Sequence, residues 1–411
     1  MILGTGWSSY ALLKTIDKSK YDVIVVSPRN HFLFTPLLAS TTVGTLEFRS
    51  IIEPVRNTVF RQSDHFHLSH AINLDTNCKK LSCQSLLKQD HKYDLSYDRL
   101  AIGVGALSNT FGVPGVEEHA FYLKEVADAR AIRNRLLSNF ELALQPGIED
   151  EERKRLLHIV IVGGGPTGVE FGAELYDFVE QDVARLYKSE EKDIKVTLVE
   201  SNQILGMFDE RLRAYAEKKI KQRDRMSLVQ SSVTEVRADG VTLADGTDMP
   251  CGLVVWSTGL APRQFTKHVD LPRNERGQII TDDYMRVKGY KDGSIFAIGD
   301  CADIENNSLP CTAQVAERQG RYLAKLMNSC QTLNCDIDSA EPFKFRSMGM
   351  LAYIGRYQAL TDIPNMKLQG VPSWFLWRSA YLTRLGSWRL RMQVPIDWLK
   401  TLIYGRDISR F

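Results

Sequence analysis

The chain has 411 residues, of which 52 are lysine or arginine and 50 are aspartate or glutamate, so its formal net charge is +2. This near balance gives no reason to expect a nucleic-acid partner, and the length allows two or three domains with well-filled cores. The absence of any run of 18 apolar residues excludes a predicted membrane-spanning helix.

The first element is a short apolar stretch followed by a glycine turn. Residues 1–3 lead into Gly4-x-Gly6-x-x-Ser9, a spacing that allows a tight turn and a close backbone approach to a phosphate. Ser9 stands where a third glycine is usual. A three-residue strand is shorter than the typical length of about five residues, and no basic, apolar signal precedes it. We therefore expect that the natural N-terminus, with a targeting peptide, is missing.

The next segments contain a strand, an apolar loop and a helix. Residues 21–26 predict a strand that ends at Ser27-Pro28-Arg29, where a ribose-binding acid would be expected. The stretch HFLFTPLLAS at 31–40 is too apolar for an ordinary surface connection. It is interpreted either as core or as the lining of a flat cofactor ring. We expect residues 45–62 to be helical.

Short alternating strands are predicted over residues 64–100. A buried strand that closes on glycines follows at 100–105, and one or two charged helices follow at 117–145.

A second glycine turn lies in the stretch HIVIVGGGPTGVE, residues 158–170. Four β-branched residues lead into three spaced glycines, Gly163, Gly165 and Gly168, and a helix is predicted at 171–183. Strand, turn and helix in this order are typical of a dinucleotide site, where the helix N-terminus faces the pyrophosphate. The next strand, 194–199, ends on Glu200, which is placed to accept a hydrogen bond from an adenosine ribose hydroxyl. The alternative is a tight turn without a ligand.

The two glycine turns indicate two similar α/β domains. Each turn is followed later by a strand that closes on glycine, at 102–105 and at 254–259. We predict two Rossmann-like dinucleotide-binding domains, the second inserted in the first, and a C-terminal amphipathic helical segment. The expected boundaries are 1–116 and 261–345 for the first domain, 117–260 for the second and 346–411 for the C-terminal region.

An acid and a helix start follow the inserted domain. The stretch IFAIGDCA at 295–302 is a buried strand that ends near Asp300, which is either a ligand contact or a helix cap. A helix is predicted at 312–327, with Gln314 in its first turn. A helix N-terminus directed at an electron-poor ring would stabilise negative charge on it.

The composition changes in the tail, residues 371–411, which holds four of the six tryptophans. Trp374, Trp377 and Tyr381 recur at helical spacing, and a similar pattern follows Trp398 after Pro395 restarts the helix. An apolar aromatic face bordered by basic residues is typical of a helix in a membrane interface. A dimerisation or core-packing helix is the alternative.

The seven cysteines form an odd number scattered over a large chain, which favours reduced thiols over a disulfide framework. The pairs Cys78/Cys83 and Cys330/Cys335 share a C-x4-C spacing. They lie outside the glycine turns, and surface or packing thiols are the favoured interpretation.

Together these motifs resemble the type II (alternative, non-proton-pumping) NADH:quinone oxidoreductases, a group of flavoproteins with two dinucleotide-binding domains. The segments that carry the resemblance are GTGWSS at 4–9, SPRNHFLFTPLL at 27–38, SIIEPVR at 50–56, NTFGVPGV at 109–116, GGGPTGVE at 163–170, FAIGDCA at 296–302, TAQVAERQG at 312–320, LAYIG at 351–355 and GRDISRF at 405–411. FTPLL, AQVA and GRDISRF are much more specific than the glycine turns.

The resemblance implies FAD in the first domain and NADH in the inserted domain. The implied FAD contacts are Gly4, Gly6, Ser9, Arg29, Pro36, Leu37, Leu38, Asp300 and Ala313. The implied NADH contacts are Gly163, Gly165, Gly168 and Glu200. Glu200 argues against NADPH because it would repel a 2′-phosphate.

The resemblance also implies a quinone site beside the flavin. Gln314 matches the first glutamine of the family's AQxAxQ segment, Arg318 replaces the second, and Tyr353 lies in LAYIG. Glu170, expected on the first turn of its helix, either benefits from the helix dipole or helps to deliver a proton to quinone. Gln314 and Glu170 are thus the candidate catalytic residues. No metal is expected, and no EF-hand loop that would provide calcium control is present.

The expected activity is transfer of two electrons from NADH to ubiquinone without proton pumping. Competing hypotheses are a flavoprotein reductase of a protein disulfide or iron–sulfur carrier, and a redox-sensing flavoprotein without rapid turnover. We expect a homodimer bound peripherally to the mitochondrial inner membrane through residues 371–411, with a bacterial plasma membrane as the fallback.

Overall fold

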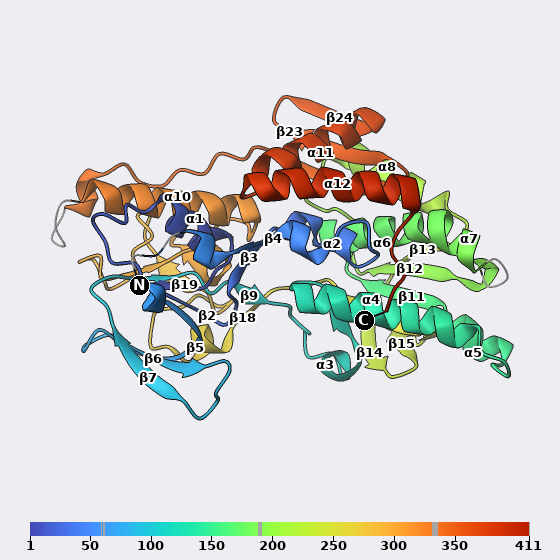
Figure 1. The fold of residues 1–411 in the computed structure, drawn as a ribbon, viewed down its shortest axis with the longest axis horizontal. Coiled ribbons are helices and arrows are strands. Elements are labelled where there is room, and N and C mark those ends of the chain that lie inside the picture. The colour runs from blue at the N-terminus through green and yellow to red at the C-terminus, as the bar shows by residue number, and fades with distance from the viewer. Residues whose placement is uncertain (59, 61, 188–190, 331–335, 411) are drawn as a thin grey trace. The chain divides into compact units, whose positions relative to one another are not determined.

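The fold is described from a computed structural model that covers residues 1–58, 60, 62–187, 191–330 and 336–410 (Figure 1). The chain forms two compact units, each built from segments that are far apart in sequence. Unit 1 comprises residues 1–33, 53–107 and 260–347, and unit 2 comprises residues 34–52, 108–259 and 348–411.

Unit 1 is organised around a seven-stranded sheet with the order β20-β8-β1-β2-β5-β6-β7. The strands of this sheet are β1 (Ile2–Leu3), β2 (Val25–Ser27), β5 (Phe66–Asp75), β6 (Lys80–Ser85), β7 (Lys92–Ser96), β8 (Leu100–Ile102) and β20 (Ile295–Ala297). The first five strands in the order pair in parallel, and β5, β6 and β7 form antiparallel hairpins. The predicted strands in 64–100 are confirmed.

Helices and short strands complete unit 1. Its α-helices are α1 (Trp7–Thr15), α9 (Gln264–His268) and α10 (Ala313–Ser329). Its remaining strands are β3 (His31–Leu33), β9 (Ala106–Leu107), β18 (Ala261–Pro262), β19 (Ile279–Thr281) and β21 (Ala302–Ile304). Helices α1 and α10 lie side by side (Figure 1). Gly320 makes this possible, because a Cβ there would lie 2.0 Å from the Ser8 carbonyl oxygen.

Unit 2 contains a five-stranded parallel sheet with the order β10-β17-β11-β12-β13. Its strands are β10 (Phe121–Tyr122), β11 (His158–Val162), β12 (Lys195–Glu200), β13 (Met226–Gln230) and β17 (Leu253–Trp256). All five residues of β11 are buried, as its near-continuous β-branched sequence predicts for a central parallel strand. Two three-stranded antiparallel sheets accompany it: β14 (Val233–Arg237), β15 (Gly240–Leu243) and β16 (Asp248–Pro250); and β22 (Met350–Gly355), β23 (Gln358–Ile363) and β24 (Met366–Gly370).

The α-helices of unit 2 are α2 (Leu38–Thr41), α3 (Val116–His119), α4 (Val126–Ala143), α5 (Asp150–Leu156), α6 (Pro166–Phe178), α7 (Ala184–Leu186), α8 (Glu210–Lys221), α11 (Val371–Arg384) and α12 (Trp388–Tyr404). A π-helical turn, Val179–Val183, continues α6. No helix within the described residues is both long and apolar enough to cross a membrane.

Two predictions about local structure are wrong. Residues 45–62 are not helical: the described part holds the short 3₁₀ turns Phe48–Ile51 and Val55–Thr58 on either side of β4 (Ile52–Pro54). Pro54 disfavours helical geometry at the preceding residue, and β-branched Ile52 favours extended backbone. Pro395 does not restart a helix but lies inside α12.

Candidate functional site

The first glycine turn, between β1 and α1, has the geometry of a phosphate-binding turn. Gly4 has a φ of +97°, and a Cβ there would lie 2.5 Å from the Gly103 carbonyl oxygen, so only glycine fits. The Ser9 hydroxyl donates to the carbonyls of Leu3 and Gly103. Ser9 therefore replaces the usual third glycine by bonding within the turn, in space that Gly103 leaves open.

The N-terminus of α1 is open to an anion. Gly6 caps the helix without a side chain, no acid lies in the first turn, and nothing lies within 4 Å of the place where a Gly6 Cβ would be. Arg29, at the end of β2, donates from Nε to Thr5 Oγ1 at 3.4 Å and from Nη2 to Thr5 O at 3.3 Å. The expected ribose-binding acid is thus replaced by a cation beside the turn, where it adds to the positive potential of the helix N-terminus.

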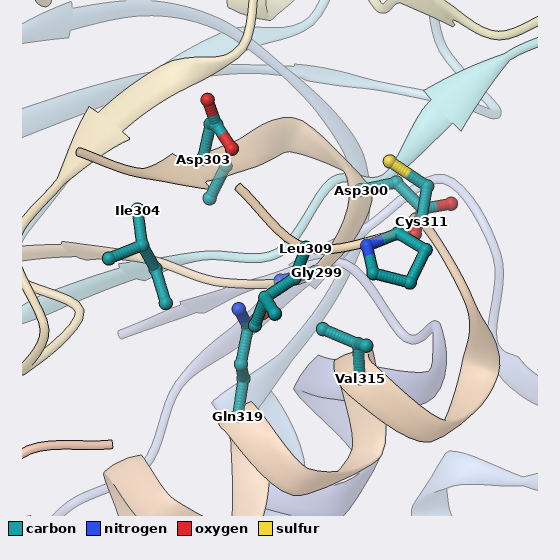
Figure 2. Close-up of a pocket in the computed structure, with 10 residues that line it drawn as sticks. Gly299, Asp300, Asp303, Ile304, Leu309, Cys311, Val315 and Gln319 are labelled. Carbon is teal, nitrogen blue, oxygen red and sulfur yellow. The ribbon is translucent and has the colours of Figure 1, made fainter. Parts of the chain in front are cut away.

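Asp300 lies beside this turn, because β20 and β1 are both neighbours of β8 in the parallel sheet. The Gly299 N–H donates to Gln319 Oε1 at 2.7 Å, which ties the loop after β20 to α10. A small, partly open pocket follows the loop. Asp300 and Cys311 lie at one end of this pocket, and Asp303 and Ile304 lie at the other (Figure 2).

Helix α10 begins where the sequence predicts. Thr312 caps it by accepting from the Val315 N–H, and Ala313 and Gln314 are half-buried in the first turn. Arg318 lies one turn later, donates to the Arg346 carbonyl oxygen and lies over the Phe345 ring, 5.4 Å from its centroid. The Arg318 head group is thus engaged within unit 1.

The FTPLL segment divides into an outer and an inner part. Thr35 is exposed and Pro36 is half-buried, whereas Leu37 and Leu38 are buried in unit 2. Packing thus accounts for the two leucines, and the two preceding residues form the accessible part.

The second glycine turn, between β11 and α6, assigns a different task to each glycine. Gly163 has a φ of +112°, and a Cβ at Gly168 would lie 2.0 Å from the Gly163 carbonyl oxygen. Gly165 caps α6, and nothing lies within 4 Å of its Cβ position. Gly163 and Gly168 therefore serve the fold, and Gly165 leaves free space above the helix N-terminus.

Glu200 ends β12 beside this turn. Its Oε2 accepts from the Gly164 N–H at 2.7 Å, and its Oε1 accepts from the Asn202 N–H at 2.9 Å. The carboxylate is thus fixed at the carboxyl edge of the sheet, where dinucleotide ribose hydroxyls bind in such folds.

Glu170 lies in the second turn of α6, and the expectation that it lies in the first turn is wrong. Pro166 begins the helix, one turn earlier than the sequence analysis assumed. Glu170 is 7% exposed and accepts from the Tyr353 N–H at 3.1 Å and from the Trp377 indole N–H at 3.3 Å. Burial raises its pKa to about 8, and the nearby Glu174 adds to the effect. Glu170 is therefore protonated at neutral pH.

Two further buried acids follow on α6, and the sequence analysis did not find them. Glu174 accepts from Ser40 and Thr45, and Asp177 accepts from the Tyr353 hydroxyl. Their i+4 and i+7 spacing from Glu170 was the available signal, since it places all three acids on one helix face. Tyr353 stacks on Trp377 with ring centroids 5.3 Å apart. The Tyr353 phenol is thus engaged by Asp177 and its ring by Trp377.

The aromatic face predicted on α11 packs inward rather than toward solvent. Trp377 is 3% exposed, and Tyr381 lies against Trp377 and Phe34. Five exposed apolar residues form a stripe along α12. This stripe consists of Trp388, Met392, Ile396, Leu399 and Ile403. Its i, i+4, i+8, i+11, i+15 spacing keeps it on one face, opposite buried Leu390 and Val394.

Five of the cysteines form no disulfide: Cys78, Cys83, Cys251, Cys301 and Cys311. The second C-x4-C pair includes Cys335, which lies outside the described residues.

Two family models together match most of the chain. Residues 1–320 match the pyridine nucleotide-disulphide oxidoreductase model, and residues 348–407 match the NDH2 C-terminal domain.

Curated relatives and a solved structure extend this likeness over the full length. The chain is 44% identical to the internal alternative NAD(P)H-ubiquinone oxidoreductase A1, mitochondrial, of Arabidopsis thaliana, over 100% of this chain and 85% of that protein. It is 45% identical to a probable NADH dehydrogenase of Dictyostelium discoideum, over 100% of this chain and 91% of that protein. The structure of NDH2 from Plasmodium falciparum in complex with NADH aligns with a TM-score of 0.93 and 28% identity, over 99% of both chains.

Proposed function

Because the chain belongs to the pyridine nucleotide-disulphide oxidoreductase family, and within it to the type II NADH dehydrogenases (NDH2), we propose that it transfers two electrons from NADH to ubiquinone. The observation that carries this function is the full-length likeness, which includes the NDH2 C-terminal domain as well as the nucleotide-binding regions. A likeness limited to the glycine turns would support only the larger family.

Unit 1 fits FAD, which the family implies. The support is the turn 4–9, where the positive end of the α1 dipole, the space above Gly6 and the Arg29 guanidinium suit a pyrophosphate. We assign Gly4, Gly6, Ser9, Arg29 and Asp300 to this cofactor. The family resemblance also implies ring contacts by Ala313, Pro36, Leu37 and Leu38, of which the two leucines are already buried by packing. When bound, FAD supplies a ring that accepts two electrons from NADH and gives them to quinone.

Unit 2 fits NADH by the same physical argument. The space above Gly165 and the N-terminus of α6 suit the pyrophosphate, while Gly163 and Gly168 keep the turn tight. Glu200 is oriented to accept from the ribose hydroxyls. The domain boundaries 1–116, 117–260, 261–345 and 346–411 are proposed on this basis as the FAD-binding, NADH-binding, FAD-binding and membrane-association regions.

Quinone reduction requires two electrons and two protons, and the chain supplies a proton donor for it. Glu170 is protonated at neutral pH because burial raises its pKa to about 8. We assign it the role of giving a proton to the reduced quinone and regaining it from solvent. Gln314, in the first turn of α10, is assigned to orient the quinone, with Arg318 and Tyr353 as further quinone contacts.

The site of action is proposed to be the surface of the mitochondrial inner membrane. The relatives named mitochondrial support the compartment. The α12 stripe supports attachment in the plane of the interface, because a helix with one exposed apolar face binds there without spanning. A homodimer is the remaining proposal, and sedimentation of the purified protein in detergent measures it.

The decisive experiment measures NADH oxidation by flavin-loaded, full-length protein with a short-chain ubiquinone. We expect turnover that requires the quinone and yields one quinol per NADH. Negligible quinone reduction by protein with a full flavin complement would reject the function. Deletion of residues 371–411 is unsuitable as a control, because Trp377 and Arg406 are buried in unit 2.

A further inference from the structure

Residues 405–410 place a buried cation within unit 2. Arg406 is 9% exposed, and its Nη1 donates to Asp182 Oδ2 at 2.8 Å and to Gln181 Oε1 at 3.0 Å. Its backbone N–H donates to Asp182 Oδ1 at 3.1 Å. Asp182 belongs to the π-helical turn after α6 and is 2% exposed. This pair anchors the segment 405–410 to the end of α6.

The other edge of the same guanidinium orients a hydroxyl. Arg406 Nε donates to Thr45 Oγ1 at 2.8 Å, and Thr45 Oγ1 donates to Glu174 Oε2 at 2.6 Å. An arginine only donates, so the Thr45 oxygen must accept from it, and the single Thr45 proton is directed to Glu174. Ser40 donates to the other oxygen, Glu174 Oε1, at 2.8 Å. Both oxygens therefore accept, which is the pattern of an ionised carboxylate.

Glu174 connects this chain of hydrogen bonds to Glu170, one helical turn earlier on α6. The segment 38–45 contacts Glu174 through Ser40 and Thr45. Asp177 on α6 and Tyr353 on β22 also face the acids, and α11 contributes Trp377, Arg378 and Tyr381. Arg406 is the cation that bonds directly to the Thr45 hydroxyl.

We propose that Arg406 is a positioning residue for quinone reduction: through Thr45 it holds the segment 38–45 on α6 and keeps Glu174 ionised, so that Glu170 retains its proton. This inference rests on the proposed function, because it concerns the proton that quinone reduction consumes. It assigns a purpose to the GRDISRF segment beyond packing.

Loss of the Arg406–Thr45 contact is expected to lower the pKa of Glu170. Burial raises the pKa of Glu174, and the charge of Arg406 opposes that rise. Without the Arg406–Thr45 contact the pKa of Glu174 rises further, and Glu170 then loses part of the neighbouring negative charge that helps to raise its own pKa. The Glu170 pKa therefore falls, and its proton is lost at a lower pH.

The test compares Thr45→Val and Arg406→Gln with two matched controls. Thr45→Val removes the hydroxyl but keeps the side-chain shape and the Arg406–Asp182 pair, so it remains informative if Arg406→Gln folds poorly. Thr45→Ser restores a hydroxyl. Arg410→Gln makes the arginine-to-glutamine change at an exposed position of the same segment.

Two measurements are made on each protein as a function of pH. Stopped-flow oxidation of the NADH-reduced enzyme by short-chain ubiquinone should lose activity at a pH about one unit lower in both test variants. Reduction of the flavin by NADH should be unchanged, and both controls should follow the wild type. Infrared titration of the buried, protonated carboxyl band should show the same downward shift, with Glu170→Gln identifying the band.

The outcomes separate the two proposals. Wild-type pH profiles and infrared titrations in Thr45→Val would overturn the positioning role even if Arg406→Gln were shifted. Faster hydrogen exchange of residues 38–45 in Thr45→Val, with no change in Thr45→Ser, is the expected structural signature. If the wild type itself reduces no quinone, the proposed function fails, while infrared titration and hydrogen exchange still decide whether Arg406 acts through Thr45 on Glu174.

Discussion

Burial of the Glu170 carboxyl favours its protonated form, so that this side chain can hold a proton at neutral pH. A glutamate in water is ionised at pH 7, but this side chain is enclosed by α6, β22 and α11 and has only two N–H donors on one oxygen. Two neutral donors do not replace the hydration of a charge. The neutral form is therefore favoured, and the group is suited to give a proton rather than to balance a cation.

The raised pKa of Glu170 predicts an unusual pH dependence of stability. The pKa of Glu170 rises from 4.5 in the unfolded chain to about 8 in the folded one, so the folded state holds the extra proton between these values and loses stability as pH rises. Glu170→Gln cannot titrate and keeps the shape. The free energy of unfolding of Glu170→Gln, relative to that of the wild type, should therefore increase between pH 4.5 and 8 by up to about 5 kcal/mol. Above pH 8 this difference should stay constant. Urea denaturation at pH 5, 7 and 9 measures it; a constant difference would contradict the buried neutral acid.

At the residue scale, the charge of Glu200 is expected to set the preference for NADH over NADPH. Glu200→Gln keeps an oxygen that can accept from the Gly164 N–H but removes the charge that repels a 2′-phosphate. We expect kcat/KM for NADPH to rise about tenfold or more, because like-charge contacts cost several kcal/mol, and kcat/KM for NADH to fall. Steady-state kinetics with both cofactors measure this change. Glu210→Gln, an exposed acid in the same unit, should change neither value.

At the scale of elements, the two glycines at the start of α6 have different roles. Gly168 is required by the fold, and Gly165 is required by the ligand. Gly168→Ala places a Cβ 2.0 Å from the Gly163 carbonyl oxygen and should destabilise the protein by about 1–3 kcal/mol. Gly165→Ala meets open space and should cost less, about 0.5–1 kcal/mol, because alanine is a poorer N-cap than glycine. It should nevertheless weaken NADH binding, because the methyl group occupies the place of the pyrophosphate. Thermal unfolding and NADH titration of the two variants test the assignment; equal unfolding free energies would refute it.

Sequence reasoning succeeded for elements whose cause is local. The glycine turns, the β-branched strand β11 and the capped start of α10 all follow from neighbouring residues, and each lies at the predicted place. It failed at 45–62, where Pro54 interrupts the expected helix. It also failed at α11, where the helical period alone does not tell an inward face from an outward one. Whether the aromatic face of a helix points inward or outward depends on which other parts of the chain pack against that helix.

The site was predictable to the same extent. Turn residues and Glu200 follow from spacing, but Arg406 meets Asp182 across 224 positions of sequence. No local sequence pattern predicts such a contact. The acids at Glu174 and Asp177 carried a weak signal, since charged side chains on a buried helix face require partners, yet those partners come from residues 40–45 and 353–356.

At the scale of the whole molecule, the two units repeat one architecture. The orders β20-β8-β1-β2-β5 and β10-β17-β11-β12-β13 each place a glycine turn after the middle strand. Two glycine turns and two closing strands in the sequence predict this repetition. The C-terminal region was expected to be separate, whereas residues 348–411 pack within unit 2.

The α12 stripe predicts how the whole molecule binds to a membrane surface. Ile396→Glu combined with Leu399→Glu should abolish co-sedimentation with phospholipid vesicles, because each charge must leave water on binding. Turnover with a short-chain, water-soluble quinone should persist, whereas turnover with a long-chain quinone held in vesicles should be lost. Met207→Glu, an exposed apolar position outside α12, is the control. Unaltered vesicle binding would exclude the stripe as the attachment surface.

The interleaving of the two units has a consequence for biosynthesis. Strand β8 bonds to β1 on one side and to β20 on the other, and β20 follows β1 by about 290 residues. At a synthesis rate of about 5–20 residues per second, the nascent unit 1 waits about 15–60 s for its last parallel strand. Unit 2 waits longer still, until residues 405–410 leave the ribosome and supply Arg406. During that interval open strand edges are exposed and can pair with other chains, so both units are prone to aggregation until their last segments have been made.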